Sequence, residues 1–316
     1  MYRNIFIGAL FAIFSTTSNA AAPFSKVENP GFYRIMLGDF EVTALSDGIS
    51  AMPADKILIN TKPQQLENAL AVNNLSLPLP TSVNAYLINT GEKLVLIDAG
   101  TGALHGESLG KTLKNLNASG YQVEQVDEIY LTHLHPDHVG GLMAESKIVF
   151  PNAVVRVEKE EVDFWLSEDK KRQAEEKDKR FFDAAIVSLK PYETSGQLKT
   201  FEGNQELTPG ISAVDTRGHT PGHSVFSIES KGKKMVVLGD MIHVAAVQFT
   251  DPNVAIAYDI DASAAVAQRK RLFDELAEKK DLVAGAHLSF PGLGYINKSG
   301  SGYDWHPLNY GVMNNK

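Results

Sequence analysis

Short apolar runs bounded by turn residues recur along the chain and predict many strands. These runs occupy residues 83–89, 94–97, 128–132, 153–157, 211–214, 225–229, 235–238 and 282–286, and residues 32–45 form a predicted hairpin that turns at Gly38-Asp39. Helical periodicity is predicted at 64–72, 108–118, 159–190 and 263–280. Strands that alternate with helices favour an α/β fold in which helices cover the sheets.

Polar residues with metal-binding side chains follow the apolar runs at five places. The residues that follow are Asp98, His133, His219, Asp240 and His287. Ligand sites in open α/β sheets collect at the carboxyl ends of the strands, so these side chains are expected to converge. One such histidine is ordinarily a satisfied core or surface residue, but several converging histidines indicate a metal site.

The segment 133–138 contains four metal-ligand side chains in six residues, His133, His135, Asp137 and His138. Side chains alternate along a strand, so His133 and His135 are expected to point the same way. Pro136 is suited to open a helix, which would aim the other two side chains differently. This arrangement suits two adjacent divalent ions such as zinc, manganese, iron or cobalt. The alternative is a solvated histidine-rich loop.

Composition narrows the classes of function further. The 316 residues include 30 basic and 38 acidic side chains, for a net charge of -8. Nucleic-acid-binding proteins usually carry a basic field, so no nucleic-acid partner is predicted. The chain has no cysteine, which excludes disulfides and thiolate ligands.

The N-terminus has the pattern of a secretory signal peptide. Arg3 precedes an apolar run, 5–14, and small residues follow up to Ala22. We therefore predict a signal peptide at 1–22, a single hydrolase domain at 23–316, and a periplasmic or secreted location. The alternative is a buried N-terminal helix. No other stretch has the pattern of a membrane span, so none is expected in the mature protein.

Taken together, these motifs resemble those of the metallo-β-lactamase superfamily. Residues 133–138 match its HxHxDH motif, 218–223 match its GHTPGH segment, and Leu238-Gly239-Asp240 and Ala286-His287 match its later ligand positions. The resemblance implies an αββα sandwich, two sheets flanked by helices. Within the superfamily, segments 37–48, 126–130, 163–167 and 286–292 are similar to the methyl parathion hydrolase family and its lactonase and arylesterase relatives.

The resemblance implies a role for each ligand residue. One ion would be held by His133, His135 and His219, the second by Asp137, His138 and His287, and Asp240 would bridge them. Two bridged ions, most simply Zn²⁺, can share a hydroxide and polarise a carbonyl or phosphoryl oxygen. Asp240 and Asp137 are also assigned to catalysis. Asp98 and His223 are expected to orient ligands or to close turns.

The substrate pocket departs from the methyl parathion hydrolase pattern. Trp165 and Phe181 match its aromatic positions, whereas His105, His243, Tyr258 and Ile57 replace phenylalanine, two leucines and arginine. A more polar pocket favours lactones or aryl esters, with organophosphate triesters as a side activity.

Other readings of the sequence stay open. Within the fold, these are a dedicated organophosphate hydrolase and a β-lactamase, whereas the predicted secretion speaks against a thioesterase and the acidic balance speaks against a nuclease. Outside the enzyme class, the alternative is a non-catalytic metal-binding protein. The resemblance to methyl parathion hydrolase also implies a homodimer.

Overall fold

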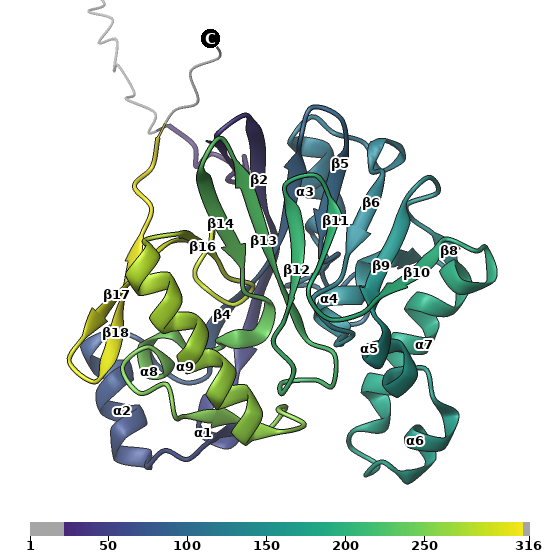
Figure 1. Ribbon diagram of the computed structural model, residues 1–316. Coiled ribbons are helices and arrows are strands. Elements are labelled where there is room, and N and C mark those ends of the chain that lie inside the picture. The colour runs from purple at the N-terminus through teal and green to yellow at the C-terminus, as the bar shows by residue number, and fades with distance from the viewer. Residues whose placement is uncertain (1–21, 312–316) are drawn as a thin grey trace, which may run out of the picture.

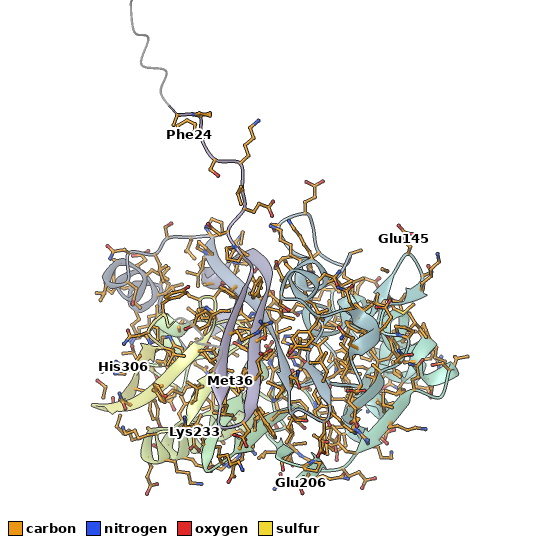
Figure 2. All side chains as sticks on the ribbon, turned by 90° about the horizontal axis from the view of Figure 1, so that it is seen from above. Phe24, Met36, Glu145, Glu206, Lys233 and His306 are labelled. Carbon is orange, nitrogen blue, oxygen red and sulfur yellow. The ribbon has the colours of Figure 1, made fainter. Side chains whose placement is uncertain are left out.

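The computed structural model describes residues 22–311, so the predicted signal peptide lies almost entirely outside the described residues. Residues 22–30 form no helix or strand, and Phe24 extends away from the folded body (Figure 2). No helix within 22–311 combines the length and the apolar character that a membrane span requires.

Two seven-stranded sheets form the centre of the fold (Figure 1). The first has the order β1 (Phe32–Leu37), β2 (Phe40–Met52), β4 (Leu79–Asn89), β5 (Leu94–Ile97), β6 (Glu128–Tyr130), β9 (Val154–Glu158) and β10 (Leu198–Phe201). The second has the order β11 (Gln205–Thr208), β12 (Ile211–Asp215), β13 (Ser224–Ser230), β14 (Lys233–Val237), β16 (Leu282–Ala284), β17 (Leu293–Ser299) and β18 (Gly302–Pro307). Strands β5, β6, β9 and β10 run parallel, as do β14 and β16, which places their carboxyl ends at one edge.

Helices and short elements complete the described chain. The helices are α1 (Ala54–Ile57), α2 (Pro63–Val72), α3 (Thr112–Ala118), α4 (Pro136–Val139), α5 (Lys159–Trp165), α6 (Glu168–Gln173), α7 (Lys179–Thr194), α8 (Ala245–Gln248) and α9 (Ala262–Lys279). The 3₁₀ turns are η1 (Val123–Gln125), η2 (Gly140–Leu142) and η3 (Gly239–Met241), and two-stranded pairs join β3 (Leu58–Ile59) to β15 (Ala255–Ile256) and β7 (Met143–Ala144) to β8 (Lys147–Ile148).

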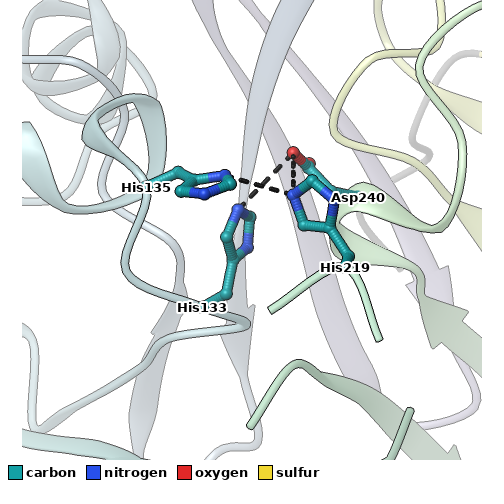
Figure 3. Close-up of side chains that lie close together, drawn as sticks. All are labelled: His133, His135, His219 and Asp240. Atoms are coloured by element: carbon teal, nitrogen blue, oxygen red, sulfur yellow. Dashed lines mark hydrogen bonds and ion pairs between the residues drawn. The ribbon is translucent and has the colours of Figure 1, made fainter. Parts of the chain in front are cut away.

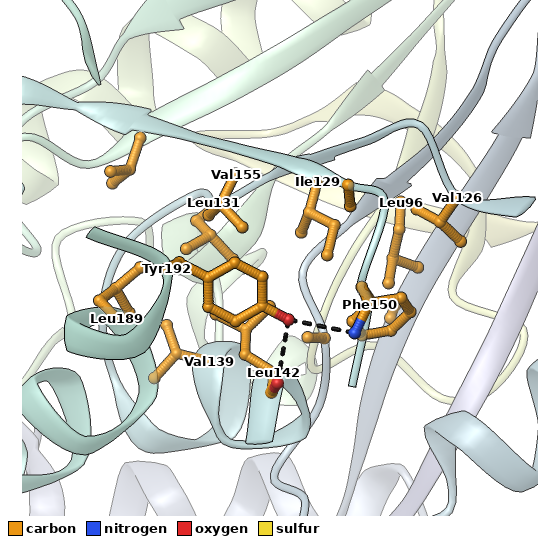
Figure 4. Close-up of a cluster of buried hydrophobic side chains, with 14 of the residues drawn as sticks. Leu96, Val126, Ile129, Leu131, Val139, Leu142, Phe150, Val155, Leu189 and Tyr192 are labelled. Atoms are coloured by element: carbon orange, nitrogen blue, oxygen red, sulfur yellow. Dashed lines mark hydrogen bonds between the residues drawn. The ribbon is translucent and has the colours of Figure 1, made fainter. Parts of the chain in front are cut away.

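Buried side chains form layers that match the predicted sandwich. One apolar cluster lies between the sheets and includes Tyr130 and Phe226, whose ring centroids are 5.5 Å apart. A second lies between the first sheet and its helices, where the Tyr192 hydroxyl donates to the carbonyl of Leu142 and accepts from the amide of Phe150 (Figure 4). A third packs α9 on the second sheet. The αββα arrangement is therefore confirmed.

Several predicted elements differ from the structure in extent. The helix predicted at 159–190 is three helices, because Ser167 caps α6 by accepting the amide of Lys170 and a turn precedes α7. The helix predicted at 108–118 begins only at Thr112. Strands β17 and β18 have no counterpart in the prediction, because their alternating polar residues resemble a loop.

Candidate metal centre

The histidine and aspartate residues of the sequence motifs meet where the two sheets converge. His133 and His135 follow β6, and α4 begins at Pro136, as the sequence predicts. The second sheet contributes His219 after β12 and Asp240 after β14. Asp240 follows Gly239, which has φ +52°, and a Cβ at Gly239 would lie 2.7 Å from Nε2 of His223. Glycine therefore lets this turn pass close to the cluster.

One group of potential ligands consists of His133, His135, His219 and Asp240. Asp240 Oδ2 lies 3.5 Å from His133 Nε2 and 3.3 Å from His219 Nε2 (Figure 3). His219 Nε2 is also 3.1 Å from His135 Nδ1. One nitrogen of each ring therefore points to a common centre, with the carboxylate on one side.

A second group consists of Asp137, His138 and His287. Nε2 of His138 and Nε2 of His287 each lie 3.1 Å from Asp240 Oδ1. Asp137 Oδ2 lies 3.6 Å from the former nitrogen and 3.5 Å from the latter. Asp240 thus presents one oxygen to each group, which is the geometry expected of a bridging carboxylate.

The electrostatic surroundings lower the pKa values of three of these ligand residues. Burial, reinforced by the neighbouring His138, lowers the pKa of His133 well below its ordinary value. Burial together with His219 does the same to the pKa of His135. Burial alone would raise the pKa of Asp240, but the surrounding histidines, His287 foremost, hold it well below its usual range. The pKa shifts of His133, His135 and Asp240 favour the protonation states that a metal requires. Burial alone would also lower the pKa values of His138, His219 and His287, but the neighbouring carboxylates, Asp240 foremost, raise them, so an ion must displace protons from these three rings.

In His138 and His287, the ring nitrogen that faces away from the cluster contacts an oxygen acceptor. His138 Nδ1 lies 2.8 Å from Asp98 Oδ2, and His287 Nδ1 lies 3.0 Å from the carbonyl oxygen of Ser82. Each contact fixes which nitrogen faces the cluster. His223 acts differently, because its Nε2 accepts the backbone amide of Asp240 at 3.1 Å.

Two further buried carboxylates were not identified from the sequence. Asp259 Oδ1 lies 2.8 Å from His219 Nδ1, and its side chain is fully buried. Glu161 accepts the backbone amides of Leu134 at 3.2 Å and Gly222 at 2.8 Å, so it joins the two loops that carry ligand histidines. Glu161 lies in a charged segment at the start of α5, and Asp259 follows a segment that was not predicted to be a strand, so no sequence signal distinguished either residue.

A cavity of about 920 Å³ opens onto the cluster. Its floor includes His135, Asp137, Asp240 and His287, and its walls include the predicted substrate-binding residues His105, Phe181, His243 and Tyr258. Apolar side chains from the end of β2, the loop before α3 and α7 line most of the remainder. His243 is buried, with Nε2 3.0 Å from Asp240 Oδ2 and its ring stacked on His287.

Two residues predicted to line the substrate pocket lie elsewhere. Trp165 is 1% exposed, and it packs in the helix-side core and borders a smaller cavity of about 400 Å³. Its ring still contacts His135 edge-on, with centroids 5.4 Å apart. Ile57 is buried among Met52, Leu66 and neighbouring apolar residues, because the chain turns into β3 immediately after it.

The donor set fits two metal ions. Nε2 of His133, Nε2 of His138 and Oδ1 of Asp240 are buried without a hydrogen-bond partner in the described part of the chain. Buried polar atoms normally find partners, so their convergence indicates a cation. An αββα sandwich with such a centre at its strand ends defines a metal-dependent hydrolase.

Comparison with known proteins identifies the family. The sequence profile of the Metallo-beta-lactamase superfamily matches residues 78–287, and the chain belongs to this superfamily. The fold of the hydrolase AbOPH, in the beta lactamase superfamily, superposes with a TM-score of 0.86 at 36% identity, covering 90% of this chain and 100% of that one.

Two relatives carry names that describe lactonases. The dizinc quorum-quenching lactonase AidC, solved with the product N-hexanoyl-L-homoserine, matches with a TM-score of 0.83 at 31% identity, covering 90% of this chain and 99% of that one. The N-acyl homoserine lactonase of Bacillus cereus is 26% identical over 255 residues, which are 75% of this chain and 91% of the relative.

Proposed function

We propose that this protein is a binuclear zinc lactonase that hydrolyses lactones carrying an apolar acyl chain, with aryl esters as further substrates. The observation that carries the proposal is the single Asp240 carboxylate shared by two ligand groups on the floor of a cavity of about 920 Å³. Histidine and carboxylate donors without thiolates suit zinc. The relative described as a dizinc lactonase supports the same choice.

Each part of the site has a task in ester hydrolysis. Two bound ions would polarise the carbonyl oxygen and supply a water of lowered pKa, so that no serine or cysteine nucleophile is needed. Asp240 would hold both ions in register, while Asp98 and Ser82 keep His138 and His287 turned towards them. The apolar wall would exclude water from the acyl chain and orient the ester over the cluster.

Substrate class follows from how the cavity is lined. Leu104, Leu109 and Val187 offer apolar surface suited to an alkyl chain. Phe181 and Tyr258 add aromatic surface to the lining, with ring centroids 6.0 Å apart, and the ring of Phe181 lies 4.9 Å from that of His135. His243 and Tyr258 also line this cavity, and their N–H and O–H groups would donate hydrogen bonds to the carbonyl oxygen of a lactone or an amide. N-acyl homoserine lactones combine these two features.

Organophosphate triester hydrolysis is proposed as a side activity. It rests on the sequence resemblance to methyl parathion hydrolase, in which two metals activate water against phosphorus. His243 occupies space above Asp240 that a tetrahedral phosphotriester would need, and this favours the flatter carbonyl substrate.

A side-by-side assay tests the proposal. Zinc-loaded protein would be given N-acyl homoserine lactones of several chain lengths, an aryl acetate and an aryl phosphotriester, and kcat/KM would be compared. We expect the order lactone, then aryl ester, then phosphotriester, and no activity in Asp240→Asn. Preference for the phosphotriester would overturn the lactonase assignment, and two bound ions without any hydrolysis would indicate a non-catalytic metal-binding protein.

The location and assembly of the protein are proposed from sequence alone. The N-terminal pattern supports export and cleavage near Ala20 or Ala22. Intact-mass measurement of protein exported by a Gram-negative host would test it, and a retained leader on active protein would contradict it. A homodimer is proposed from the family resemblance, and light scattering coupled to size exclusion would measure it.

A further inference from the structure

His219 is held by a carboxylate from a distant part of the chain. Its Nε2 faces the cluster, whereas its Nδ1 lies 2.8 Å from Oδ1 of Asp259. Both side chains are almost completely buried. Asp259 is therefore an anionic acceptor that fixes the ring of His219 and increases its basicity. Asp98 has the same relation to His138.

Asp259 lies in a segment that contacts the His219 loop along its backbone as well. The amide of Ile260 donates to the carbonyl of His219 at 2.9 Å, and the amide of Asp261 donates to that of Gly218 at 2.8 Å. Gly218 has φ +142°, and a Cβ there would lie 2.3 Å from the amide nitrogen of Ala265. Only glycine permits this approach, so the two segments are fitted closely to one another.

The same segment forms part of the wall of the substrate cavity. Tyr258 precedes Asp259 directly, lines the large cavity and contacts Phe181. Oδ2 of Asp259 accepts the amide of Ile256 at 3.1 Å, which closes a tight turn around Tyr258. The backbone position of Tyr258 is thus set by a side chain whose other oxygen holds a predicted metal ligand.

We propose that Asp259 is a positioning residue that couples the ion at His133, His135 and His219 to the Tyr258 wall of the cavity. The inference rests on the proposed function, since it assumes that this ion is bound. A coupling of this kind acts in both directions: the ion orders the wall, and the wall supports the ion. Loss of the carboxylate charge should therefore weaken the binding of this ion and leave the binding of the second ion unchanged.

The test uses Asp259→Asn in the full mature chain. Asparagine keeps the size of the side chain but removes its charge, and its single acceptor oxygen can serve only one of the two partners, His219 Nδ1 and the amide of Ile256. Stepwise zinc titration against a chromophoric chelator should show that the affinity for one of the two ions falls about 10–100-fold. Asp98→Asn should instead lower the affinity for the other ion, which His138 would hold.

A matched control is available two residues away. Asp261→Asn makes the same chemical change at an exposed residue that caps α9 by accepting the amide of Ala264, and asparagine caps as well as aspartate. It should leave both zinc affinities unchanged. A purely structural role for Asp259 would lower the melting temperature without selecting one ion.

A second measurement follows the backbone of the Asp259 segment directly. Hydrogen exchange of wild-type amides in 256–261 should slow when zinc is added, and Asp259→Asn should lose that response at zinc levels that still fill the other site. The inference would be overturned by equal zinc affinities in Asp259→Asn and wild type. It would also be overturned if zinc did not change the hydrogen-exchange rates of residues 256–261 in wild type. Wild type that binds two ions without hydrolysing esters would overturn only the proposed function.

Discussion

Replacing Trp165 with alanine should destabilise the fold and should not produce a selective loss for aromatic substrates. The indole ring is 1% exposed and packs against Phe164 and Phe182 at centroid distances of 4.8 Å each. Truncating a buried Trp typically costs about 3–5 kcal/mol, because the neighbours close the hole only partly. Its Nε1 has no hydrogen-bond partner among residues 22–311, so the cost comes from packing alone.

The size of the effect can be expressed as a change in melting temperature. An unfolding entropy of roughly 2.1 cal/mol/K per residue over roughly 290 folded residues gives about 0.6 kcal/mol/K. A loss of about 3–5 kcal/mol then lowers the melting temperature by roughly 5–8 °C. Both proteins should be measured at the same saturating zinc concentration, because bound metal raises stability by mass action.

Kinetics give the second half of this test. The ring of Trp165 supports His135 edge-on, so its loss should lower kcat/KM for aliphatic and aromatic substrates alike. Trp165→Phe keeps most ring contacts and should lie close to wild type in both measurements. An unchanged melting temperature together with a selective loss for aromatic substrates would refute this reasoning and would place Trp165 in contact with substrate.

Three other predictions concern single side chains at the site. Asp240→Asn should lower the affinity for both ions, because both ligand groups share its carboxylate. His287→Ala should chiefly remove the ion of its own group, and elemental analysis distinguishes the two results. His243→Leu should raise the ratio of phosphotriester to lactone kcat/KM, and a tenfold change needs only about 1.4 kcal/mol. Burial raises the pKa of Glu161 to about 7, so the folded protein retains a proton there that the unfolded chain has lost, and the contribution of Glu161 to stability should fall as pH rises from about 4.5 to 7. Glu161→Gln should flatten that slope in melting temperature against pH.

The fold and the ligand residues could be predicted because each depends on local sequence. A buried parallel strand places the residue that follows it at a known edge of the sheet, so the sequence alone predicts that Asp98, His133 and Asp240 converge. Asp259 could not be found this way. Its partner His219 is 40 residues away in the sequence. The position of Asp259 depends on a turn and on the pairing of β15 with β3, and neither leaves a periodic pattern in the sequence.

The pocket was harder to predict than the metal centre for the same reason. Trp165 and Phe181 occur in one helical region of the sequence, but the break between α5, α6 and α7 turns them to different environments. Phe181 faces the large cavity, while Trp165 enters the core. Periodicity specifies a face of a helix only as long as the helix is continuous, and a cap at Ser167 ends that continuity.

The burial of the ligand residues separates an enzyme from a storage or structural metal protein. Structural zinc sites are closed by four protein ligands, whereas catalytic sites keep an open position. Here His133, His138 and Asp240 are buried on the protein side, yet Asp137 retains 23% exposure of its side chain. Asp137 and Asp240 also border the cavity of about 920 Å³, far more space than an ion needs. A protein that only stored metal would gain nothing from an apolar cavity over its ligands, whereas a hydrolase needs such a space to hold its substrate beside the metal ligands.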